Sequence, residues 1–169
     1  MDPGLKQLIG LVSLSMALGM LIMLFLTSRL LGVFIIAFTV VYGKKALYPI
    51  YTFILITGIF NGFASWWIPY IYIWAVLWGI VMLLPRRMPK WLAVPLYMIV
   101  CGLHGLAYGT LYAPVQAIAY GLDWKAMLTW IASGFPWDVA HAIGNVVSGI
   151  LIVPISSVLL RLERKYSSR

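Results

Sequence analysis

Residues 102–149 read GLHGLAYGTLYAPVQAIAYGLDWKAMLTWIASGFPWDVAHAIGNVVSG, and their polar side chains fall into helical register. Four of them recur every four residues and so share one stripe of a helix: His104, Tyr108, Tyr112 and Gln116. After a short loop, a second stripe follows at i, i+3 and i+7: Asp138, His141 and Asn145. If the two helices run antiparallel, the stripes meet and form a pocket, and the rest of the chain serves as its scaffold.

The composition around this stretch is that of an integral membrane protein. Of the 169 residues, 63% are hydrophobic and 9% are charged, whereas a soluble domain is about half apolar and about a quarter charged. Lipid offers no hydrogen-bond partners, so the backbone has to form helices or a closed barrel. The apolar runs are continuous and do not alternate, which favours helices. We therefore expect an all-α, polytopic membrane protein with one domain over 1–169. The single cysteine, Cys101, excludes an internal disulfide.

The apolar runs predict a bundle of six helices. They cover about 5–27, 30–43, 47–62, 70–84, 91–119 and 136–164. The second and third are shorter than the roughly 20 residues of a straight crossing, so they form either two short crossings or one re-entrant hairpin. Pro114 predicts a kink in the fifth helix. Residues 121–134 are expected to form a short amphipathic connection, and Pro136 to begin the last helix, where proline is favoured.

The basic residues set the expected orientation. Six crossings place both termini on one side, together with all the Lys and Arg residues except Arg29 and Lys125. Because cytoplasmic segments are rich in Lys and Arg, we expect both termini to be cytoplasmic. The Lys and Arg residues of the cytoplasmic segments then account for the net charge of +8. No nucleic-acid partner is needed to explain this charge.

This orientation gathers the polar side chains in the outer half of the membrane, where such groups are costly and by default mark a substrate or ion path. Directional hydrogen bonds to a ligand are predicted for Gln116, Asp138, His141 and Asn145. Stacking on the ligand or closure of the pocket is predicted for Tyr108, Tyr112, Trp66, Trp67 and Trp137. Arg29 either snorkels to lipid headgroups or binds an anionic group of the ligand.

Each of these residues also has a structural interpretation. Asp138 can offset the dipole of its helix, His141 can pair with Asp138 one turn away, and Asn145 can join two helices. Trp66 and Trp67 can anchor the chain at the membrane interface. His104, expected at mid-membrane, is assigned a structural role. The hypothesis of a binding site depends on the coincidence of these residues in one layer.

Small residues mark two further helix faces. In 5–27 they lie four residues apart, Ser13 with Ala17 and Ser15 with Gly19, and in 91–119 they form a stripe next to the polar one: Gly105, Gly109, Ala113 and Ala117. Small residues at this spacing let another helix approach closely. For 5–27 the neighbour is either a helix of the same chain or another protein.

Three segments together resemble a known family: LYAPVQ (111–116), YGLDW (120–124) and GFPWDVAHAIGNVVSGILIVPI (134–155). With the Gly-Phe-Pro-x-Asp-x-x-His-x-x-Gly-Asn opening of the last segment, residues 102–160 are similar to the substrate-binding S components of energy-coupling factor (ECF) transporters. The resemblance implies high-affinity binding of a water-soluble vitamin or related micronutrient, in an outward-facing cavity, at the cell membrane of a prokaryote.

The same resemblance implies partners. They are a coupling transmembrane subunit and two ABC-type ATPases, and the family docks through small residues on the first helix, here Ser13, Ser15, Ala17 and Gly19. The chain has no G-x-x-x-x-G-K-[ST] nucleotide loop, so we expect no enzymatic activity, cofactor or metal of its own. Three alternatives stay open: a stand-alone carrier or channel, a redox protein with haem or metal on His104 and His141, and a structural assembly subunit.

Overall fold

A computed structural model describes residues 29–85 and 88–167, together with Gly4 and Gly10. The helix expected over 5–27, with Ser13, Ser15, Ala17 and Gly19, lies outside the described residues. Every regular element within 29–85 and 88–167 is helical, which confirms the all-α class. The elements are α2 (Arg29–Tyr42), η1 (Gly43–Ala46), α3 (Leu47–Asn61), α4 (Tyr70–Leu83), α5 (Lys90–Leu106), α6 (Tyr108–Tyr120), α7 (Trp124–Gly149) and α8 (Ile152–Ser167).

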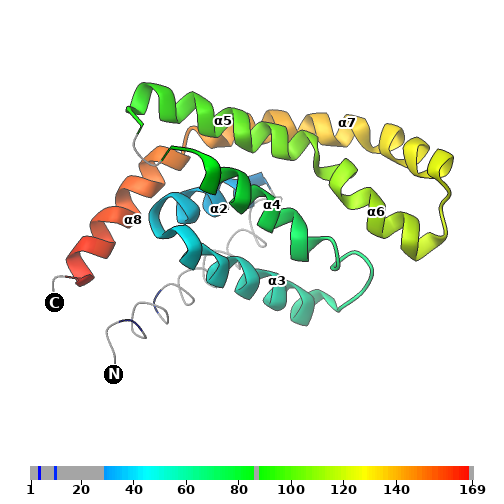
Figure 1. The fold of residues 1–169 in the computed structure, drawn as a ribbon, viewed down its shortest axis with the longest axis horizontal. Helices are drawn as coiled ribbons and strands as arrows, with labels where there is room; N and C mark the ends of the chain where they lie inside the picture. The colour runs from blue at the N-terminus through cyan, green and yellow to red at the C-terminus, as the bar shows by residue number, and fades with distance from the viewer. Residues whose placement is uncertain (1–3, 5–9, 11–28, 86–87, 168–169) are drawn as a thin grey trace.

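The fold is built on α5 and α7, which Figure 1 shows side by side. Close contacts along the pair and its continuation into α6 join Met98 to Gly149, Gly102 to Val146, Gly105 to Asn145 and Gly109 to Asp138. Residue numbers rise along α5 and α6 while they fall along α7, so the helices are antiparallel, as the sequence predicts. A Cβ atom on any of these glycines would collide with its neighbour, which explains why small residues line this contact.

The apolar core lies between this pair and the helices α2 and α4. Val33 and Ile36 of α2 are fully buried and pack with Leu77 of α4. Cys101 of α5 belongs to the same core. Its side chain has no exposed surface, and a Cβ on Gly32 would lie 3.1 Å from its sulfur. The core therefore seals the only cysteine of the sequence.

Within the described residues, two helical runs are long and apolar enough to cross a membrane, or three if the bent pair α7–α8 is one span. The first run is Leu30–Asn61, in which η1 joins α2 to α3, and the second is Lys90–Tyr120. At roughly 1.5 Å per residue, each exceeds a hydrocarbon core of roughly 30 Å. Such helices are those of a membrane protein. The six crossings and the side of the termini stay predictions.

The helix boundaries around Pro136 differ from those predicted. The connection over 121–134 and the helix start at Pro136 are wrong, because α7 begins at Trp124 and runs through the proline to Gly149. Asp123 caps α7, since its carboxylate accepts a first-turn N–H at 2.7 Å. Proline removes a single backbone hydrogen bond, and packing against α6 holds the helix across it. The chain then bends by 50° into α8, so the predicted 136–164 is not one helix.

The fifth predicted helix has an interruption at Ala107 that the sequence did not predict. The helix α6 continues through Pro114, and the kink expected there stays a prediction. In an unbroken helix the N–H of Gly109 donates to the carbonyl of Gly105, but here it donates to Oδ1 of Asp138 at 3.1 Å. A side chain that inserts into the backbone ladder is a known cause of a helix break. Asp138 of α7 thus supplies an acceptor for a backbone N–H next to the interruption.

Candidate functional site

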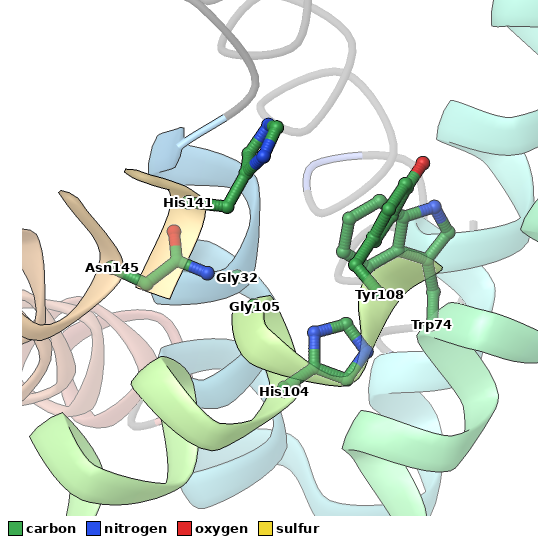
Figure 2. Close-up of a pocket in the computed structure, with 7 residues that line it drawn as sticks. All are labelled: Gly32, Trp74, His104, Gly105, Tyr108, His141 and Asn145. Atoms are coloured by element: carbon green, nitrogen blue, oxygen red, sulfur yellow. The ribbon is translucent and has the colours of Figure 1, made fainter. Parts of the chain in front are cut away.

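A cavity of about 90 Å³ lies where α5 and α6 meet α7, α4 and α2. Figure 2 shows its lining residues. They are Gly32, Trp74, His104, Gly105, Tyr108, His141 and Asn145. The two polar stripes of the sequence therefore both reach this space, through His104 and Tyr108 on one side and His141 and Asn145 on the other.

His104 is held at the base of the cavity with a defined tautomer. Its Nε2 lies 3.0 Å from the carbonyl oxygen of Ile73, and its side chain is 4% exposed. A carbonyl oxygen can only accept, so Nε2 carries the hydrogen. In the uncharged ring, Nδ1 therefore keeps a free lone pair. The ring also lies against the indole of Trp74, at a centroid distance of 5.4 Å.

His141 has the opposite tautomer. Its Nδ1 lies 2.8 Å from the carbonyl oxygen of Trp137, one turn earlier on α7, so Nδ1 is the donor and Nε2 keeps the lone pair. The ring faces Tyr108 at a centroid distance of 6.0 Å, and the two planes are within 19° of parallel. The cavity thus has two nearly parallel aromatic walls.

Asn145 lies beside His141 on the α7 side of the cavity, as Figure 2 shows. One N–H of its amide donates to the carbonyl of Cys101 at 3.2 Å, and the residue is 7% exposed. A Cβ on Gly105 would lie 2.6 Å from this nitrogen, so the glycine makes room for the amide. Asn145 thus joins α7 to α5, as its structural interpretation predicts. It also lines the cavity, where a ligand-binding residue would lie.

Asp138 is buried between α6 and α7 and does not line the cavity. Its Oδ1 accepts the N–H of Gly109, and its Oδ2 has no hydrogen-bond partner. The residue is 5% exposed. A carboxyl group in this position fixes the first turn of α6, where Tyr108 begins the aromatic wall.

The loop between α3 and α4 is fastened by three other predicted residues. Trp67 donates its Nε1–H to the carbonyl of Ile54 at 2.7 Å, and the carbonyl of Trp66 accepts the hydroxyl of Tyr112 at 2.6 Å. The ring of Tyr112 stacks on Trp130 of α7 with centroids 6.3 Å apart. In the structure these residues hold a loop against the bundle, and none of the three lines the cavity.

The remaining predicted residues are more peripheral. Gln116 is half-buried on α6, and Trp137 is 73% exposed on α7. Neither lines the cavity. Arg29 is the first residue of α2. Within the described part of the chain, no group of three or more His, Cys, Asp or Glu residues is placed to hold a metal ion.

No protein-family model, curated protein or solved structure matches this chain. The cavity is therefore interpreted from its own residues.

Two lining residues, Trp74 and Gly32, are not among the residues that the sequence predicts. Trp74 lies in α4, whose apolar run carries no polar residue that would distinguish it. Its indole is 4% exposed, and its Nε1–H is buried without a partner. His104 lies on the polar stripe, but the sequence assigned it a structural role. His104 and Tyr108 both line the cavity. Their spacing of four residues, which places them on one face of a helix, could have indicated this.

Replacement of Trp67 by phenylalanine is expected to lower the apparent melting temperature in detergent, by the equivalent of about 1 kcal/mol. Phenylalanine keeps an aromatic ring but removes the indole N–H that donates to the carbonyl of Ile54. The control is Trp124→Phe, because the indole of Trp124 is 70% exposed. Circular dichroism during heating measures both. Equal melting temperatures for Trp67→Phe and the native chain would show that this bond does not hold the loop.

Proposed function

We propose that this chain is the substrate-binding S component of an ECF-type ABC importer. It binds a water-soluble vitamin or related micronutrient from outside the cell and moves it across the membrane. In this proposal, the chain is a multi-pass protein of a prokaryotic cell membrane with cytoplasmic termini. The sequence resemblance over 102–160 and the site geometry support the proposal independently.

One observation carries the binding role, namely the polar cavity within an apolar helix bundle. Two histidines and an asparagine reach it, and their positions lie within helices that are apolar enough to cross a membrane. Polar groups at such depth are expensive in lipid, so they are kept mainly where a substrate or ion uses them. Aromatic rings of Trp74 and Tyr108 complete the lining, as in many small-molecule sites.

The energy for transport is assigned to partners. The sequence has no nucleotide-binding loop, so two ABC-type ATPases and a coupling transmembrane subunit supply it. Docking to that subunit is proposed for Ser13, Ser15, Ala17 and Gly19, where small side chains permit close helix packing. The lipid bilayer is the remaining partner.

The direct test is to identify what the purified protein binds. The protein is extracted in detergent and washed, and small molecules released by denaturation are identified by mass spectrometry. The identified compound is then supplied to vesicles that contain the protein with or without the ATPases and the coupling subunit. Accumulation only with the full set supports the proposal. Sustained uptake by the protein alone would indicate a carrier, and a haem or metal absorption band a redox protein.

Replacement of Asn145 by alanine is expected to weaken binding of the copurified compound by about tenfold, since one ligand hydrogen bond contributes on the order of 1 kcal/mol. The control is Asn61→Ala. Asn61 also donates its amide to a backbone carbonyl, Thr57 at 3.1 Å, but it lies outside the cavity. Equilibrium dialysis measures both variants. Unchanged affinity in a stably folded Asn145→Ala protein would contradict the role of the cavity.

A further inference from the structure

We infer that the cavity selects a planar nitrogen-containing ring that donates N–H hydrogen bonds, such as an amino-substituted azine or an aromatic carboxamide. The inference rests on the proposed function and specifies the substrate class of the same site. It follows from which side-chain atoms remain free once the hydrogen bonds among the described residues are assigned.

The free atoms are mostly acceptors. The carbonyls of Ile73 and Trp137 occupy one nitrogen of each histidine, which leaves the lone pairs of His104 Nδ1 and His141 Nε2. Asn145 keeps its Oδ1 and one N–H after donating to Cys101. The described residues therefore offer the cavity three free acceptors and one amide donor, while the Nε1–H of Trp74, a second unpaired donor, is buried. A ligand has to supply N–H or O–H groups to match the acceptors.

These free atoms are within reach of a ligand. Among the described residues, the buried side-chain polar atoms without a partner are Trp74 Nε1 and Asp138 Oδ2. The free atoms of His104, His141 and Asn145 are not among them, and all three residues line the cavity. Figure 2 shows the hydroxyl of Tyr108 pointing away from His104 and Asn145. This hydroxyl does not change the balance of donors and acceptors.

The shape of the cavity favours a flat group. Tyr108 and His141 face each other within 19° of parallel, and the indole of Trp74 adds a third flat surface. The volume of about 90 Å³ corresponds to roughly three water molecules and is below the roughly 150 Å³ that accommodates benzene. The amino-bearing edge of a ring fits this space.

The charge of the described lining favours an uncharged group. Among the residues that the structure describes, none that lines the cavity is Asp, Glu, Lys or Arg. A carboxylate or phosphate would lose its hydration and meet mainly acceptor atoms, which is strongly unfavourable. An uncharged N–H donor instead replaces its bonds to water with bonds to the imidazole and amide acceptors.

The test compares isosteric probes that differ in one donor. The first pair is 4-aminopyrimidine and 4-methylpyrimidine, and the second is nicotinamide and 3-acetylpyridine. Dissociation constants are measured at neutral pH in detergent by ligand-observed NMR. The amino or carboxamide member is expected to bind about tenfold more tightly in each pair, since a missing donor leaves a buried acceptor unpaired.

Variants of His104 separate a binding role from a structural one. His104→Leu removes the acceptor, so the affinity ratio within each pair is expected to approach one. A merely structural defect would weaken both members equally and leave the ratio unchanged. His104→Gln provides the rescue, because its amide can donate to Ile73 and still present an oxygen to the cavity. The ratio is expected to recover in this variant.

Several results would overturn the inference. They are equal or reversed affinities within the pairs, a ratio that His104→Leu leaves unchanged, and no binding of any probe. If the probes fail while the copurified compound still binds and accumulates with the ATPases, the substrate class is wrong and the proposed function stands. If no compound copurifies and none accumulates with the full set, the proposed function fails as well.

Discussion

A Gly105→Ala protein is expected to unfold at a clearly lower temperature than the native chain and to lose most of its ligand binding. The added Cβ would lie 2.6 Å from the amide nitrogen of Asn145 and 3.1 Å from backbone atoms of His141 and Ala142. The asparagine can turn away, but the backbone contacts require α5 and α7 to separate. Overpacking of this kind costs about 1–3 kcal/mol. Two lining residues, Asn145 and His141, shift at the same time.

A matched control exists on α4. A Cβ on Gly79 meets nothing within 4 Å, so Gly79→Ala adds the same methyl group without a collision. The control is expected to be neutral or stabilising by up to about 1 kcal/mol, since alanine is the better helix former. Fluorescence-detected size-exclusion chromatography after heating compares the two variants. If both behave alike, the close approach of α5 and α7 is not what requires glycine at 105.

The second large effect is expected for Asp138→Ala. The substitution removes the acceptor of the Gly109 N–H, which is then left buried in an apolar surrounding. An unsatisfied buried donor costs about 1–3 kcal/mol. The first turn of α6 loses its attachment to α7, so Tyr108 no longer keeps its near-parallel position against His141. Ligand affinity is therefore expected to fall by more than the loss of stability alone predicts.

Two controls define the role of Asp138. Asp138→Asn keeps an oxygen for the Gly109 N–H, and it is expected to retain most of the stability and binding. Asp123→Ala removes an exposed carboxylate that also accepts a backbone N–H, and it is expected to cost about 1 kcal/mol of helix capping with no effect on binding. Thermal unfolding and equilibrium dialysis distinguish the cases. Strong loss of binding in Asp138→Asn would show that the ligand requires the negative charge.

The central part of the fold could be predicted from the sequence because helical periodicity is local. The spacing of His104, Tyr108 and Gln116 indicated one helix stripe, and that of Asp138 and Asn145 indicated another. The glycines beside the first stripe indicated where the helices approach. The structure places these helices antiparallel and in contact at Gly105 and Gly109. The helical class follows equally from composition, since long apolar runs in lipid have few other solutions.

What could not be predicted depends on neighbours distant in sequence. Helix α7 continues through Pro136 because α6 packs along it, and a proline signal alone does not report that support. Asp138 accepts the N–H of Gly109 and does not line the cavity. That N–H belongs to another helix, next to an interruption at Ala107 that the local sequence does not indicate. Trp74 enters the site from α4, whose sequence is apolar throughout and therefore carries no signal of a binding role.

The enclosure of Cys101 provides a means of mapping which side of the membrane each loop faces. Its thiol is sealed, and the sequence holds no other cysteine, so a membrane-impermeant maleimide reaches only a cysteine introduced at the surface. Lys44 and Phe63 are exposed at opposite ends of α3, and each can be replaced in turn by cysteine. Labelling of intact and permeabilised cells then shows the side of the membrane on which each site lies, without removal of the native cysteine.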